Sequence, residues 1–420
     1  MEERYPYQGG RTLASLTLKA CKKTYTKETH RAVSPEETLE RVAPVARSCG
    51  ITQVTDITGL DRLNIPVFSC IRSGAADGAI SVYNGKGATP IAARVSAIME
   101  GIERYSAEIN ERELIHEKFS SLGEARGVNP KDLILPRGVD PDTLIPWHQG
   151  FDIINEEDVY VPAHVVFHPV PHGTMRFIRT STNGIASGNT LEEAVFHALS
   201  EVVERDAWSL VEASGNAGPV LENIDHPQLN AMIEAFSENE VDLLIRDITS
   251  DNGVPTIAAV ADDVRLKDPS LLCIGMGTHV SPVIAAMRAI TEVAQSRATQ
   301  IHGARENTTE ADFRKQIGYD RTKRLNKKWF DTTESKDISE IDEFISDDFL
   351  TDIHYVREKL QACGIDRIIV NDLTMPDVGV PVVRVTVPGL ETFAMDQDRA
   401  GERCHNARRN RVSRAKPRQR

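Results

Sequence analysis

The chain has 420 residues, of which 40% are hydrophobic and 26% are charged, close to the average for globular proteins. This composition excludes wholesale disorder and a fibrous protein, and the length favours two or three subdomains around a shared site. The net charge of −13 argues against a nucleic-acid partner, because binding phosphate backbones needs a basic surface.

The first 29 residues contain no continuous apolar run, so we expect no signal peptide. No other segment approaches the roughly 18 apolar residues of a membrane span. We therefore expect a cytoplasmic protein without a membrane partner. Its six cysteines show no CxxC pair, so we expect free thiols rather than disulfides or a zinc site.

The first predicted element is a helix. Ser34 and Glu37 match a capping box, Pro35 takes the first helical position, and the helix is expected to run to Gly50 with a kink at Pro44. Three short runs rich in β-branched residues follow and predict strands at 53–57, 65–71 and 79–83.

Three glycine-containing turns each precede a long helical pattern. GKGATP leads into a helix over 90–112, STNGIASGN into one over 191–213, and IGMGTHVS into one over 282–302. Further strands are predicted at 241–247, 256–261, 368–370 and 380–387, with a polar helical excursion over 303–349. These elements predict an α/β or α+β protein of unspecified topology.

The C-terminal segment 399–420 is basic, with nine Lys or Arg residues against the single acidic Glu402. Two interpretations stay open: a solvated, largely disordered terminus, or a segment that docks onto an acidic partner.

The three long helices share a polar stripe, because residues three and four apart lie on one helix face. The stripes consist of Ser96, Glu100 and Glu103; Glu193, His197, Glu201 and Glu204; and Arg288, Glu292 and Gln295. Arg104 and Arg205 directly follow the last glutamates of the first two stripes, so Glu-x-x-Glu-Arg occurs twice.

A pair of glutamates on a helix is often only a solvated face. Here the helices are rich in aliphatic residues and the unit is repeated, which favours two pairs that face each other. Neighbouring carboxylates about 4 Å apart repel by about 4 kcal/mol at an effective dielectric constant of about 20, so such a cluster needs cations. Oxygen ligands suit Mg²⁺, which often binds substrate phosphates, and helix N-termini suit those phosphates. No P-loop or protein-kinase motif occurs.

Three residues near these stripes have alternative interpretations. Glu193 could close a capping box with Thr190 as well as bind a ligand. His197 is more often a buried histidine than a base in such a setting. Asn189 could be a turn residue or a ligand contact.

Four segments resemble, in order and spacing, the block that precedes the ATP-binding blocks of the YcaO family and then the three ATP-binding blocks themselves. They are THRAVSPEETLERV, SVYNGKGATPIAARVSAIMEGIERYSAE, STNGIASGNTLEEAVFHALSEVVERDAW and GMGTHVSPVIAAMRAITEVAQSRATQIHG. The resemblance implies the YcaO fold, with an ATP site between subdomains. It divides the chain into an N-terminal segment (1–28), an ATP-binding core (29–310), a C-terminal part of the same domain (311–395) and a flexible basic tail (396–420).

The resemblance also implies residue roles. The Mg²⁺-coordinating glutamates of the family match Glu100, Glu103, Glu201 and Glu204. Positions that contact ATP match Ser96, Asn189, Glu193, Arg205, Arg288 and Glu292. Arg31 and Thr38 stand where the family usually has Lys and Ser, so their assignment to ATP binding departs from the family pattern. No side chain is singled out as catalytic.

YcaO proteins use ATP to phosphorylate a peptide amide oxygen, after which a nucleophile attacks the activated carbon. The segments SPEETLERV and GLDRLNIPVFSCIR resemble methanogen members that install thioglycine in the α subunit of methyl-coenzyme M reductase. The end of this chain, RAKPRQR, differs from the proline-rich tail of many azoline-forming members. The resemblance therefore implies thioamidation with sulfide, a homodimer and a TfuA-like partner.

Two other functions stay open. An azoline-forming cyclodehydratase, or an amidine-forming relative, would use the same ATP site with a different nucleophile. A non-catalytic nucleotide-binding module is the other alternative, but such a protein has less need of four metal-binding carboxylates.

Overall fold

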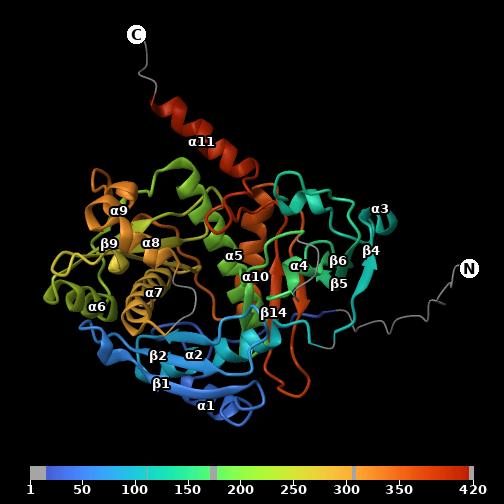
Figure 1. Cartoon of the computed structure of the whole chain (residues 1–420), viewed down its shortest axis with the longest axis horizontal. Helices are drawn as coiled ribbons and strands as arrows, with labels where there is room; N and C mark the ends of the chain where they lie inside the picture. The colour runs from blue at the N-terminus through green and yellow to red at the C-terminus, as the bar shows by residue number, and fades with distance from the viewer. Residues whose placement is uncertain (1–15, 111, 171–176, 305–308, 416–420) are drawn as a thin grey trace, which may run out of the picture.

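The computed structural model describes residues 16–110, 112–170, 177–304 and 309–415. Three β-sheets, each packed against one long helix, form the body of the molecule (Figure 1). Those helices are α2 (Pro90–Ser106), α5 (Leu191–Ser214) and α7 (Pro282–His302). No helix in these ranges combines the length and the apolar character that crossing a membrane requires.

The N-terminal sheet has the strand order β1-β2-β3, with antiparallel neighbours. Its strands are β1 (Ile51–Asp56), β2 (Val67–Arg72) and β3 (Val82–Lys86), and a 3₁₀ turn at Thr58–Leu60 follows β1. The short helix α1 (Pro35–Val42) packs on α2, which covers β2 and β3. In Figure 1 this blue part of the chain lies below the rest of the body.

The largest sheet has the order β4-β5-β13-β14-β7, with β6 paired to β5. The strands are β4 (Ile115–Glu117), β5 (Ile145–Asp152), β6 (Glu157–Pro162), β7 (Ile185–Ser187), β13 (Ile369–Asp372) and β14 (Val382–Thr386). Helix α5 packs on β14 and β7, and α10 (Phe349–Ala362) packs on α5. Strands far apart in the sequence thus share one sheet beneath the central helix.

The third sheet has the order β11-β10-β9-β8-β12. Its strands are β8 (Val220–Glu222), β9 (Val241–Asp247), β10 (Thr256–Asp263), β11 (Cys273–Thr278) and β12 (Ser335–Asp337). Helix α7 covers β11 and β10, and α6 (Pro227–Glu238) packs on β9. Only β8 and β12 pair in parallel among the named strands, so the mixed fold is of the α+β kind.

Short helices complete the described chain. They are α3 (Phe119–Leu122), α4 (Ala163–Val166), α8 (Thr309–Ile317), α9 (Tyr319–Leu325), α11 (Glu402–Ala415), and 3₁₀ turns at Pro130–Leu133, Pro269–Leu271, Lys327–Trp329 and Ile338–Glu340. All six cysteines are free, as predicted.

Glycines allow the strands to lie directly against their helices. A Cβ atom on Gly85 in β3 would stand 2.0 Å from the backbone nitrogen of Ala97 in α2. On Gly277 in β11 it would stand 2.1 Å from the carbonyl oxygen of Ala285 in α7. Real Cβ atoms do not approach backbone this closely, so both contacts require glycine.

Several predicted boundaries were wrong. The first helix ends at Val42 instead of Gly50, because Pro44 has no amide hydrogen to donate to the helix. The strand expected at 79–83 forms at Val82–Lys86, and the helix after it ends at Ser106. The turn expected at 274–281 is largely strand β11. Thr89 and Thr190 cap α2 and α5 by accepting hydrogen bonds from backbone amides.

The basic C-terminal segment is ordered over its described part, so the expectation of a flexible tail was wrong there. It forms helix α11, which projects from the body at the top of Figure 1. Arg403 donates to both carboxylate oxygens of the fully buried Asp206 on α5, at 2.9 and 2.8 Å, and also contacts Asp251. The start of α11 is therefore fixed by a buried ion pair.

We expect Arg403→Met to destabilise the protein by about 3 kcal/mol, because it leaves the Asp206 carboxylate buried without its partner. Arg408→Met on the same helix is the matched control, since Arg408 only stacks over the Phe393 ring at 4.6 Å. Urea unfolding measures both variants. Equal, small losses for the two would show that the Arg403–Asp206 pair does not fix the helix.

Candidate active site

The three long helices surround one cavity of about 490 Å³. Its lining includes every residue that the sequence predicted for the site: Arg31, Thr38, Ser96, Glu100, Glu103, Asn189, Glu193, Glu201, Glu204, Arg205, Arg288 and Glu292. Helix α2, helix α5, helix α7 and the segment before α1 each contribute to this wall. The predicted stripes therefore do converge.

On α2 the two glutamates contact the arginine that follows them. Arg104 lies 3.2 Å from a Glu100 carboxylate oxygen and 3.7 Å from a Glu103 oxygen. The second oxygen of Glu103 accepts a hydrogen bond from the backbone amide of Ser187 at 3.1 Å. Because Ser187 ends strand β7, this bond joins α2 to the sheet that supports α5.

Helix α5 repeats the arrangement. Arg205 lies 3.8 Å from a Glu201 oxygen and 3.5 Å from a Glu204 oxygen. The guanidinium of Arg205 also stacks over the Trp208 ring at 5.5 Å. Both Glu-x-x-Glu-Arg units therefore place their carboxylates and arginine on the cavity wall in the same way.

Burial of these carboxylates changes their ionisation. The pKa of Glu103 is raised to about 8, chiefly by desolvation and also by the charges of Glu100 and Glu201, while Arg104 opposes the shift. Burial likewise raises the pKa of Glu201 and of Glu204, against the nearby Arg205. Glu103 on α2 and Glu201 on α5 thus lie close enough to repel each other. A bound cation would relieve this repulsion.

Helix α7 closes a further side of the cavity. Lys86, at the end of β3, donates a hydrogen bond from Nζ to Glu292, and its backbone amide donates to Ser96 Oγ at 3.3 Å. Lys86 and Arg205 lower the pKa of Glu292 despite burial. Lys86 could not be assigned to the site from the sequence, because a lysine between two glycines is a weak signal unless the residue that faces it is known.

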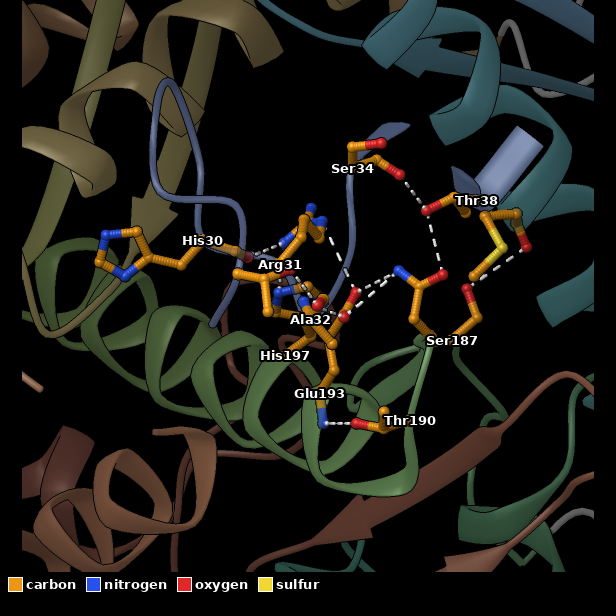
Figure 2. Close-up of polar contacts among 12 residues, drawn as sticks. His30, Arg31, Ala32, Ser34, Thr38, Ser187, Thr190, Glu193 and His197 are labelled. Carbon is orange, nitrogen blue, oxygen red and sulfur yellow. Dashed lines mark hydrogen bonds and ion pairs between the residues drawn. The ribbon is translucent and has the colours of Figure 1, made fainter. Parts of the chain in front are cut away.

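The segment before α1 and the first turn of α1 also line the cavity. Figure 2 shows the polar contacts that they make with α5. Glu193 accepts a hydrogen bond from the Ala32 backbone amide at 2.8 Å and lies 3.7 Å from Arg31. Asn189 donates to Glu193 at 3.2 Å and accepts from Thr38 at 3.0 Å. These contacts hold the segment against α5, so both Arg31 and Thr38 face the cavity.

His197 lies on the same wall and bonds through Nε2 to Arg31 Nη1. Burial lowers its pKa well below the usual value, and Arg31 and Arg288 lower it further. His197 is therefore neutral at physiological pH. This agrees with its interpretation as a buried histidine.

The donor set fits Mg²⁺ and phosphate. Four buried or half-buried glutamates supply oxygen ligands, which Mg²⁺ prefers. One buried nitrogen atom in each of Arg104, Arg205 and Arg288 has no hydrogen-bond partner among the described residues. Such buried donors are expected where an anion binds. In the same ranges no three acidic, His or Cys side chains are gathered tightly enough to hold a metal. The glutamates instead face their own arginines.

Comparison with known proteins identifies similar chains. A family profile described as YcaO cyclodehydratase, ATP- and Mg²⁺-binding, matches residues 84–391. An uncharacterized protein of Methanothermobacter thermautotrophicus is 47% identical over 385 residues, which cover 90% of this chain and 99% of that protein. An uncharacterized protein in the tfuA 3′ region of Rhizobium leguminosarum bv. trifolii is 35% identical, covering 86% of this chain and 88% of that one.

A solved structure of a YcaO protein also matches this chain. The YcaO protein of Methanopyrus kandleri bound with AMPPCP and Mg²⁺ superposes with a TM-score of 0.77 at 31% identity. The match covers 91% of this chain and 98% of that one.

We expect Glu201→Gln to weaken binding of Mg²⁺-ATP by about tenfold or more, because an amide cannot balance the charge of the cation. Isothermal titration with Mg²⁺-ATP measures the affinity, and urea unfolding confirms that the variant folds. The exposed Glu234→Gln on α6 is the control. Unchanged affinity in the Glu201 variant would remove this residue from the metal site.

Proposed function

The chain belongs to the YcaO family, whose members bind ATP and Mg²⁺, and we propose that it converts a peptide backbone amide into a thioamide. The observation that carries the proposal is the convergence of two Glu-x-x-Glu-Arg units on one cavity, next to unpartnered arginine nitrogens. This arrangement suits transfer of a phosphoryl group from ATP, in which positioning and charge stabilisation supply most of the catalysis.

The proposed reaction has two steps. The amide oxygen first attacks the γ-phosphorus of ATP and displaces ADP, which turns a poor leaving group into phosphate. Hydrosulfide, HS⁻, then adds to the amide carbon, the C–O bond breaks, and the phosphate that leaves takes the hydrogen of HS⁻. The products are the thioamide, ADP and hydrogen phosphate, so all atoms and charges balance.

Each group of cavity residues has a proposed part in this reaction. Glu100, Glu103, Glu201 and Glu204 would hold Mg²⁺, which supplies positive charge to the transferred phosphoryl group. Arg205 and Arg288 would face phosphate oxygens from α5 and α7. Their unpartnered nitrogens offer hydrogen bonds that no described residue accepts. Ser96 and Glu292 lie on the same wall as Lys86 and would position that end of ATP.

The other end of the cavity would bind the rest of the nucleotide. Hydrogen bonds join Thr38 to Asn189 and Asn189 to Glu193 there, and an ion pair joins Glu193 to Arg31 (Figure 2). The family usually has Lys and Ser at the first two positions, but both side chains still reach the cavity. Their donors and acceptors suit a ribose or base.

Two similarities support thioamidation over other YcaO chemistry. The segments shared with methanogen members point to a glycine of the methyl-coenzyme M reductase α subunit as the substrate. The Rhizobium relative is named for its place in the tfuA 3′ region, which supports a TfuA-like partner. We propose these two partners and a homodimer for this chain.

One observation favours a second candidate. The matching family profile is described as a cyclodehydratase, which would close a Cys, Ser or Thr side chain onto the activated amide and yield an azoline. The ATP site would be the same, and the nucleophile alone would differ.

The product distinguishes the two. We expect the protein, given ATP, Mg²⁺, sulfide and a glycine-containing peptide of the reductase subunit, to replace one amide oxygen by sulfur. Mass spectrometry of the peptide measures this, with Glu201→Gln and a reaction without sulfide as controls. Loss of one water, with or without sulfide, would select the azoline-forming function instead.

A further inference from the structure

A second, smaller cavity lies next to the first. It has a volume of about 50 Å³, enough for a small ion or a few water molecules. Its wall includes Val202, the residue after Glu201, and Asn183. The loop that contains Asn183 continues into β7, and Ile185 to Ser187 of that strand line the ATP cavity. The two cavities therefore share a wall.

Two buried arginines, Arg384 and Arg399, face this small cavity, and neither forms a close ion pair with a described carboxylate. The charges of Asp396 and Glu391 act on Arg399 from a greater distance. Arg384 on β14 is 6% exposed and donates one hydrogen bond, at 2.8 Å, to the carbonyl oxygen of Ser181. Arg399 is 8% exposed and donates only to the carbonyl oxygens of Leu133 and Ile134. Buried charges without a counter-ion are costly, so such a pair indicates a place for an anion.

The surroundings of Arg384 balance its positive charge only in part. Its pKa is lowered to about 9, chiefly by burial and also by the charges of Arg399 and Arg104, while Glu201 is the main opposing charge. The nearest carboxylate influence on Arg384 thus comes from the neighbouring ATP cavity.

The cavity also contains polar atoms without partners among the described residues. They are Nε of Arg384, the hydroxyls of Thr386 and Thr392, and the side-chain carbonyl oxygen of Asn183. The first three can donate hydrogen bonds to an anion. Asn183 Oδ1 can only accept one, so the site suits an anion that itself carries a hydrogen.

Two carboxylates on the wall, Glu391 and Asp132, offset part of this charge. Both oxygens of Glu391 accept backbone hydrogen bonds, from Gly401 at 2.9 Å and Cys404 at 2.8 Å. Asp132 is exposed, so solvent screens its charge. His164 and the exposed Arg179 complete the titratable groups that face the cavity.

We propose that this cavity, defined by Arg384, Arg399, Asn183, Thr386 and Thr392, binds hydrosulfide, the nucleophile of the reaction proposed above, on which this inference rests. Hydrosulfide is small, carries one negative charge and has one S–H donor, which matches the unpartnered donors of the wall and the unpartnered Asn183 Oδ1. Bound there, hydrosulfide would be separated from the ATP cavity by Glu201 and Val202 until the amide carbon is activated.

Bromide probes the site without any turnover, because it has the same charge as hydrosulfide and a similar size. Crystals of the full chain soaked in sodium bromide should show an anomalous scattering peak beside the Arg384 guanidinium. The peak should be lost in Arg384→Met. Water alone at this position would overturn the anion site, whatever reaction the protein catalyses.

Steady-state kinetics tests the identity of the anion. We expect Arg384→Met to raise KM for sulfide by about tenfold to a hundredfold, the usual range for loss of a hydrogen bond to a charged group. KM for ATP should change less than about twofold. Thr386→Val removes one donor at constant volume and should raise KM for sulfide severalfold, which guards against misfolding of the arginine variant. The exposed Arg137→Met is the matched control.

The outcomes separate the two proposals. If the native protein makes thioamide but neither variant changes KM for sulfide, the hydrosulfide site is wrong and the proposed function stands. If the native protein makes no thioamide at any sulfide concentration, the proposed function is wrong. A bromide peak at Arg384 would then leave an anion site whose ligand is not hydrosulfide.

Discussion

The repulsion between buried carboxylates on two helices is the constraint on which the site depends. Glu103 of α2 and Glu201 of α5 lie in one desolvated cavity, and each of their pKa values is raised. Without a cation, Arg104 and Arg205 supply the opposite charge from within the same helices. The arginines therefore balance part of the negative charge of the metal-free site. A divalent cation that binds together with a polyanion would stabilise the site most.

The fold brings the three long helices α2, α5 and α7 together around one cavity. Each of α2, α5 and α7 lies directly against the strand that precedes it, because Gly85 in β3, Gly188 just after β7 and Gly277 in β11 leave room for the helix backbone. Three sheets can then meet with their helices turned toward a common cavity. The N-terminal segment closes this cavity and is itself held in place by the buried pair of Lys23 with Asp352 on α10. Residues from opposite ends of the chain therefore support the same site.

The sequence predicted the site better than the fold. Glu100, Glu103, Glu201 and Glu204 could be assigned because helical spacing alone sets which side chains share a face. Lys86 could not, since its role depends on Glu292 some 200 residues away, a contact that only the tertiary structure creates. The strands around Trp147 and the pairing of β14 with β7 also depend on long-range contacts and were not predictable. The order of α11 was missed for the same reason, because its fixing partner Asp206 lies on α5.

In this account the glutamates of both Glu-x-x-Glu-Arg units move away from Arg104 and Arg205 and coordinate one cation together. The most direct measurement is anomalous diffraction from crystals grown with Mn²⁺ and a non-hydrolysable ATP analogue. The account predicts manganese peaks about 2.1 Å from carboxylate oxygens of both α2 and α5, with the triphosphate beside Arg205 and Arg288. Manganese bound elsewhere, with all four glutamates still paired to Arg104 and Arg205, would contradict it.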